Sequence, residues 1–155
     1  MQSFSPDEID EFLRHGTSTL CEAAALPCAL DHALRPVWPG AALAGTAFPL
    51  RCAPGDNLAI HYAVARGVGM RGCVKLHAPS VGETIVIAGV TVARGDLVVA
   101  DADGVLSIPR TQVARTLAAA RQRTDKEASM MQRLAQGETT LQILGLADRG
   151  HGRKS

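Results

Sequence analysis

The sequence predicts a single-domain α/β protein in which helices pack on a β-sheet. Its 155 residues suit one domain that can bury a core of its own. Hydrophobic residues make up 46% of the chain but aromatic residues only 3%, so the core must consist of small and branched aliphatic side chains. Such side chains suit close packing of helix on sheet. Short apolar runs in the middle of the chain, with helical patterns on either side, complete the prediction.

The first predicted helix begins at Ser5. This residue can cap the helix, Pro6 fits the first turn, and Glu8 stands three residues after the cap, as in a capping box. Gly16 is expected to end this helix, and a second short helix is expected from residue 17 or 18 to residue 25.

The middle of the chain predicts strands. Residues 42–50 are expected to enter the sheet as one strand, and residues 73–76 form a further short one. Apolar runs that alternate with tight turns predict a β-meander over residues 84–108. Asp101 and Asp103 are interpreted as turn residues and not as a metal pair, because Asp-x-Asp-Gly is chiefly a turn sequence.

The longest predicted helix covers residues 111–136 and ends at Gly137, and a small helix is expected near residues 139–146. The positions expected to pack in the core are Val113, Leu117, Ala120, Met130, Met131 and Leu134.

Composition and charge exclude several classes of protein. The formal net charge is +1 and no basic stripe is present, so no nucleic-acid partner is expected, and residues 149–155 are interpreted as a flexible basic tail. No apolar run is long enough to cross a bilayer and no signal peptide is recognisable, which predicts a cytoplasmic protein without a membrane partner. The cysteines contain no C-x-x-C pair and are expected to be free thiols: Cys21, Cys28, Cys52 and Cys73.

Six runs follow, in order along the chain, the pattern of one known family. They are residues 16–20 (GTSTL), 54–61 (PGDNLAIH), 66–75 (RGVGMRGCVK), 89–110 (GVTVARGDLVVADADGVLSIPR), 126–128 (KEA) and 142–146 (QILGL). Together they resemble the RraA-like family, which includes 4-hydroxy-4-methyl-2-oxoglutarate aldolase and the regulator of ribonuclease activity A.

The resemblance implies a swivelling-domain-like β/β/α fold assembled as a homotrimer or hexamer. For the aldolases of the family it implies class II chemistry, in which Mg²⁺ or Mn²⁺ binds a small 2-oxo acid and stabilises the pyruvate enolate that forms on carbon–carbon cleavage. The same chemistry decarboxylates oxaloacetate.

The sequence departs from the family pattern at one place. The family carries an Arg-Asp pair, for substrate and metal, in a long stretch that is missing here between about residues 64 and 66. No arginine of this chain is followed by Asp or Glu, so the metal ligands are unknown. We therefore expect one shortened domain over residues 1–148, with family-type activity impaired or lost.

Four residues are candidates for a site by resemblance. Lys75 matches a family lysine near the substrate, and Glu127 matches a glutamate on the long helix that reaches a neighbouring subunit's site, so both are candidate catalytic residues. Asn57 and His61 are candidate substrate-binding residues. Each has a plainer interpretation: a solvated cation for Lys75, a surface charge for Glu127, a helix cap for Asn57 and a packed histidine for His61. Glu22 stands where the family often has Asp.

Three hypotheses follow from the sequence. The first is a metal-dependent pyruvyl aldolase or decarboxylase of low activity. The alternative is a non-catalytic, oligomeric protein-binding module akin to the regulator of ribonuclease activity A. The third is a deletion product without a selected activity, whose exposed apolar surface would favour association.

Overall fold

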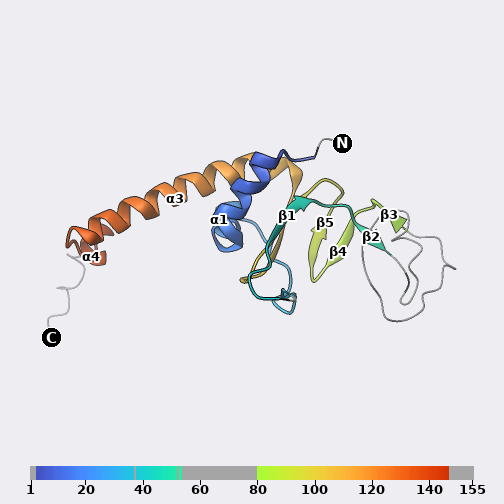
Figure 1. The fold of residues 1–155 in the computed structure, drawn as a ribbon, viewed down its shortest axis with the longest axis horizontal. Coiled ribbons are helices and arrows are strands. Elements are labelled where there is room, and N and C mark those ends of the chain that lie inside the picture. The colour runs from blue at the N-terminus through green and yellow to red at the C-terminus, as the bar shows by residue number, and fades with distance from the viewer. Residues whose placement is uncertain (1–2, 37, 52, 54–79, 147–155) are drawn as a thin grey trace, which may run out of the picture.

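The computed structural model describes residues 3–36, 38–51, 53 and 80–146 (Figure 1). The predicted α/β class is confirmed, with antiparallel pairing throughout the strands of these residues. The predicted strand at residues 73–76, the proposed deletion near residues 64–66 and the tail at residues 149–155 lie outside them. No helix of the described residues is both long and apolar enough to cross a membrane.

A three-stranded sheet forms the centre of the domain, in the order β1 (Leu43–Thr46), β6 (Leu97–Ala100), β7 (Val105–Ile108). In its register Ala44 lies opposite Val99, and Val99 lies opposite Leu106. Inward-facing residues alternate along β6, where Leu97 and Val99 are buried and their neighbours are partly exposed.

Two small strand pairs flank this sheet: β2 (Leu50–Arg51) with β3 (Ser80–Val81), and β4 (Ile85–Ile87) with β5 (Val90–Val92). The predicted strand at residues 42–50 is therefore two strands, with Pro49, which has no N–H to donate, just before the second. The predicted meander is correct in the sequence of its strands but not in its pairing, because β6 pairs with β1 and β7 rather than with β5.

The buried residue Asp96 lies in the turn between β5 and β6 and connects three segments by hydrogen bonds. Its side chain is 6% exposed, and its carboxylate accepts hydrogen bonds from the main-chain N–H groups of Ala93 (2.8 Å) and Arg110 (3.0 Å). Its carbonyl accepts from the N–H of Ala47 (2.8 Å). One buried residue therefore joins the turn before β6, the end of β7 and the end of β1.

Helix α1 (Pro6–Ala24) begins with the predicted capping box, in which Ser5 and Glu8 exchange side chain-to-main chain hydrogen bonds. Gly16 breaks its geometry with φ 72° and ψ 166°, so the predicted division at this glycine is confirmed although the two segments are continuous.

Asp101 holds the segment that follows Gly16. Its carboxylate accepts hydrogen bonds from the main-chain N–H of Thr17 (2.7 Å) and from the Thr17 hydroxyl (2.5 Å). It also accepts from the N–H of Asp103 (2.9 Å), which confirms the turn interpretation of the Asp-x-Asp-Gly run. Burial alone would raise the pKa of Asp101, but the hydrogen bonds from Thr17, Asp103 and Gly104 outweigh it and hold this pKa below its usual value.

The core lies where α1 and α3 (Val113–Ala135) pack together and where α1 meets the sheet. Its fully buried side chains come from α1, α3, the sheet and the segment that follows α1: Phe12, Leu20, Cys28, Leu97, Ile108 and Ala120. Phe4 packs edge-to-face on Phe12, with 5.8 Å between the ring centroids. The Arg110 guanidinium stacks on the ring of Phe4, 4.1 Å from its centroid.

A short 3₁₀ turn, η1 (Arg110–Gln112), leads into α3, and α4 (Thr140–Ile143) follows it. Every buried residue of α3 lies in its first eight positions: Val113, Thr116, Leu117 and Ala120. Residues 121–146, here called the arm, contain no buried side chain. Figure 1 shows the arm extending away from the sheet, with α4 at its far end. The predicted core position Met131 is wrong, since its side chain is 65% exposed.

Asp96→Ala is expected to lower the free energy of unfolding by about 2–4 kcal/mol, because two main-chain N–H groups lose a charged acceptor in a buried place. Urea denaturation measures the change. Asp125→Ala, on the exposed surface of α3, is the control and should stay within about 0.5 kcal/mol of the wild type. Equal effects of the two substitutions would contradict the role given to Asp96.

Asp101→Asn is expected to show a pH-dependent loss of stability. The folded state lowers the pKa of Asp101 from 3.8, so the carboxylate stabilises the fold above that pH and loses its effect as pH falls through the folded value. Thermal unfolding should show a lower Tm for Asp101→Asn at pH 7, and the difference from the wild type should shrink as the pH falls below 3.8. The exposed turn residue Asp103, changed to Asn, is the control. A constant difference across this pH range would rule out the proposed cause.

Candidate functional site

Only one of the four predicted site residues lies in the described part of the chain. Glu127 stands on α3 at the start of the arm, and its side chain is 51% exposed. Lys75, Asn57 and His61 lie outside the described residues, and their roles stay predictions.

Glu127 belongs to a group of three charged side chains where α1 meets α3. Its carboxylate lies 2.9 Å from Nε of Arg123, one helical turn earlier. The same guanidinium pairs with Glu22 of α1. All three side chains are about half exposed, so their ion pairs are screened by solvent and stabilise the fold little. This geometry leaves Glu127 accessible to a molecule that approaches the base of the arm.

A second charged group joins the same two helices nearer the N-terminus. Arg121 donates two hydrogen bonds to Glu11, at 2.5 and 2.6 Å, and the guanidinium lowers the pKa of this carboxyl. His15 Nδ1 lies 3.1 Å from the Thr124 hydroxyl. These contacts attach the start of the arm to α1.

The described residues do not by themselves fit a divalent metal ion. Across residues 3–36, 38–51, 53 and 80–146, no three His, Cys, Asp or Glu side chains converge. Mg²⁺ and Mn²⁺ need several oxygen ligands in near-octahedral geometry. Glu22 and Glu127 both face one arginine, and Asp101 is saturated by N–H and hydroxyl donors.

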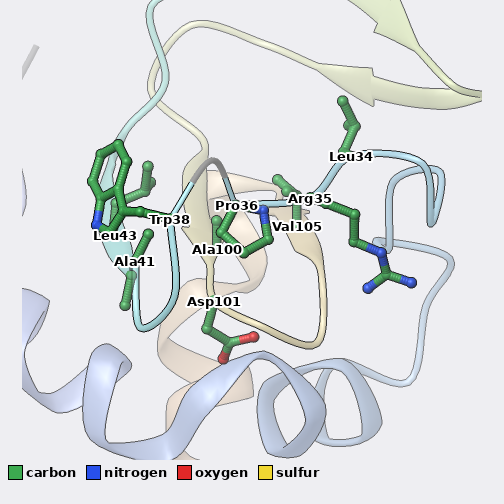
Figure 2. Close-up of a pocket in the computed structure, with 10 residues that line it drawn as sticks. Leu34, Arg35, Pro36, Trp38, Ala41, Leu43, Ala100, Asp101 and Val105 are labelled. Carbon is green, nitrogen blue, oxygen red and sulfur yellow. The ribbon is translucent and has the colours of Figure 1, made fainter.

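An apolar hollow beside the sheet, with a cavity volume of about 410 Å³, was not predicted from the sequence (Figure 2). Most of its lining is aliphatic, from residues 34–36, 38, 41–43, 100, 101 and 105. The side chain of Trp38 is 65% exposed at its edge. The only available signal was a tryptophan in a proline- and glycine-rich segment of an otherwise aromatic-poor chain.

The charged side chains beside this hollow form hydrogen bonds with other parts of the protein. Arg35 donates to the main-chain carbonyls of Ala102 (3.5 Å) and Asp103 (3.2 Å). In Figure 2 the carboxylate of Asp101 points towards α1 and away from Trp38, as its bonds to Thr17 require. The hollow therefore suits an apolar group and not the carboxylate of a 2-oxo acid.

The fold is shared with a solved structure. The crystal structure of an uncharacterized protein from Pseudomonas syringae pv. tomato superposes with a TM-score of 0.65. The alignment covers 90% of this chain and 93% of that one, at 18% sequence identity. The two chains are thus similar in length as well as in fold.

A family model also matches the sequence. It covers residues 63–107, which include the run from Gly89 to Ser107 that carries β5, β6, most of β7 and the Asp101 turn. Its description is Aldolase/RraA. The matched stretch agrees with the resemblance to the RraA-like family that rests on the sequence motifs.

Proposed function

We propose that this protein is an oligomeric RraA-like binding module that acts by protein contact and not by catalysis. The observation that carries the proposal is the arm. Residues 121–146 bury no side chain, yet they expose Met131 (65%), Leu141 (55%) and Leu144 (53%). Exposed apolar groups gathered on a projecting element are typical of a surface that meets another protein.

Local interactions order the turn between α3 and α4 in the arm. Gly137, with φ 92°, turns the chain after α3, and Thr139 begins α4 with a capping box to Gln142. Arg133 and Glu138 close the turn with two hydrogen bonds, at 2.8 and 2.5 Å. A surface that is ordered before binding loses less conformational entropy on association.

The arm also presents a groove. Its volume is about 300 Å³, and Met130, Ile143 and Leu144 line it beside the polar side chains of Lys126, Ser129 and Arg133. An apolar floor with a charged rim is the usual composition of a protein interface. Burying one such aliphatic side chain contributes up to roughly 1.5–3 kcal/mol.

A second copy of this chain is the first partner that we assign to the arm. RraA-like proteins are commonly oligomeric, and a helix that projects from its own domain can reach a neighbouring one. The family resemblance suggests a trimer or hexamer, which we carry as part of the proposal.

Leu141→Glu combined with Leu144→Glu is expected to shift the protein from an oligomer to the monomer, because each change places a charge on the apolar surface of α4. Size-exclusion chromatography with light scattering measures the mass. Gln132→Glu adds a charge to the exposed polar surface of the arm and is the control, with no change in mass expected. A wild-type protein that is monomeric, or an unchanged mass in the double variant, would contradict the proposal.

A metal-dependent pyruvyl aldolase is the second candidate function. The Aldolase/RraA description of the matching family model favours it, and so does the exposure of Glu127 at the base of the arm, where a second copy would approach. It would require a cation fixed by residues beyond those described, because enolate formation needs a charge held in place.

Pyruvate release separates the two functions. We expect 4-hydroxy-4-methyl-2-oxoglutarate and oxaloacetate, with Mg²⁺ or Mn²⁺, to react no faster with the protein than with the free ion, since losing the fixed metal costs roughly 10³-fold or more. A faster reaction that Glu127→Gln and Lys75→Met both slow would establish the aldolase function and reject the binding module as the sole activity. Arg115→Gln, exposed on the first turn of α3, is the matched charge control.

A further inference from the structure

The hollow beside Trp38 is an apolar surface that the described part of the domain leaves open. Three large hydrophobic side chains line it and are nevertheless exposed: Leu34, Trp38 and Leu43. In Figure 2, Trp38 and Leu43 lie on one side of Ala100 and Leu34 lies on the other. An apolar group that fills this space would shield all three side chains from water, which favours binding.

The arm carries its apolar side chains away from this hollow in its own chain. Residues 121–135 of α3 extend over about 22 Å at 1.5 Å per residue, and α4 lies beyond them. Figure 1 shows α4 at the far end of the arm, whereas β1 and the ends of β6 and β7, which line the hollow, belong to the sheet. Leu141 and Leu144 of α4 can therefore enter a hollow only on another molecule.

The hollow and the apolar side chains of α4 are complementary in chemistry. The lining of the hollow is mostly aliphatic, and its two charged residues already have partners. Arg35 donates to main-chain carbonyls, and Asp101 accepts hydrogen bonds from Thr17. A leucine side chain can therefore enter the hollow without leaving a charge unpaired.

Charges beside the two apolar surfaces have opposite signs. The carbonyl of Asp31 accepts a hydrogen bond from the N–H of Leu34 (3.0 Å), and Asp103 lies in the turn between β6 and β7, so both aspartates stand near the hollow. Both of these residues are exposed. On the arm, Lys126 lines the same groove as Leu144. Opposite charges around an apolar contact speed the encounter of two molecules and disfavour like-charged alternatives.

We propose that α4 of one copy docks in the Trp38 hollow of a second copy, with Leu141 and Leu144 against Trp38. The inference rests on the proposed function, which assigns the arm to a second copy, and it adds the surface that receives the arm. Because arm and hollow are different surfaces, each copy gives one arm and receives another, and the assembly closes as a ring or a reciprocal pair. An arm-to-arm contact would instead leave every hollow empty.

The fluorescence of Trp38 tests the docking in the wild-type protein, because the chain has a single tryptophan. We compare the wild type with the variant that combines Leu141→Glu and Leu144→Glu, here called the double leucine variant. The wild-type emission should lie further to the blue and acrylamide should quench it less, since docked leucines replace water around the indole. Equal emission and quenching, with the wild type oligomeric and the variant monomeric, would overturn this inference and leave the proposed function standing.

Mixing two variants tests which surfaces meet. Trp38→Glu places a charge in the hollow and keeps the arm, whereas the double leucine variant keeps the hollow and loses the apolar surface of α4, so each alone should be monomeric. Together they should form one-to-one pairs with twice the monomer mass of 16.2 kDa, because one intact arm then meets one intact hollow. The emission should also shift to the blue on mixing, and it reports only the receiving copy, since Trp38→Glu contains no tryptophan.

Val86→Glu is the matched control, because Val86 on β4 is exposed to the same degree as Trp38 and does not line the hollow, so its mass should equal that of the wild type. Circular dichroism checks that each variant is folded, and the quenching comparison does not depend on Trp38→Glu. If Trp38→Glu keeps the wild-type mass while the double leucine variant is monomeric, the arm meets another surface and this inference alone fails. Two monomeric variants that stay separate on mixing would also overturn it. A double leucine variant with the wild-type mass would contradict the proposed function as well.

Discussion

The carboxylate of Asp101 is the interaction on which the arrangement of the helices depends. Gly16 interrupts α1, and the main-chain N–H group exposed after this break, on Thr17, is satisfied by a side chain from the end of β6. The bond fixes the second half of α1 against the sheet. From there Leu20 reaches the core, which Phe12 of the first half also enters, and α3 packs against α1. Without this acceptor the N–H group of Thr17 would lack a partner at the break in the helix.

Different kinds of interaction determine the geometry of the domain and that of the arm. In the domain, buried aliphatic side chains and buried acceptors such as Asp96 and Asp101 determine the geometry. In the arm, local signals suffice: a glycine turn, a capping box and one arginine–glutamate pair. Its exposed methionine and leucines are buried by no other part of the described chain, so they gain most from a partner. This contrast is why we place the function on the arm.

The candidate site could be predicted from sequence only in part. The motifs placed Glu127 on the long helix, one turn after Arg123, and the structure adds the link through that arginine to Glu22 of α1. Residues from α1 and α3 come together only through the tertiary fold. The apolar hollow beside Trp38 arises in the same way, since it does not follow from spacing along the chain.

The sequence by itself determined the elements that local chemistry controls. The capping box at Ser5, the break at Gly16, the Asp101 turn and the end of α3 before Gly137 all depend on residues within a few positions of one another. Only the tertiary structure decided which strands pair and which faces are buried. β6 pairs with β1 because Asp96 joins three distant segments, and Met131 is exposed because α3 leaves the domain after Ala120. Periodicity identifies the apolar side of a helix. That side is buried only where another element packs on it, and the whole fold decides which elements pack together.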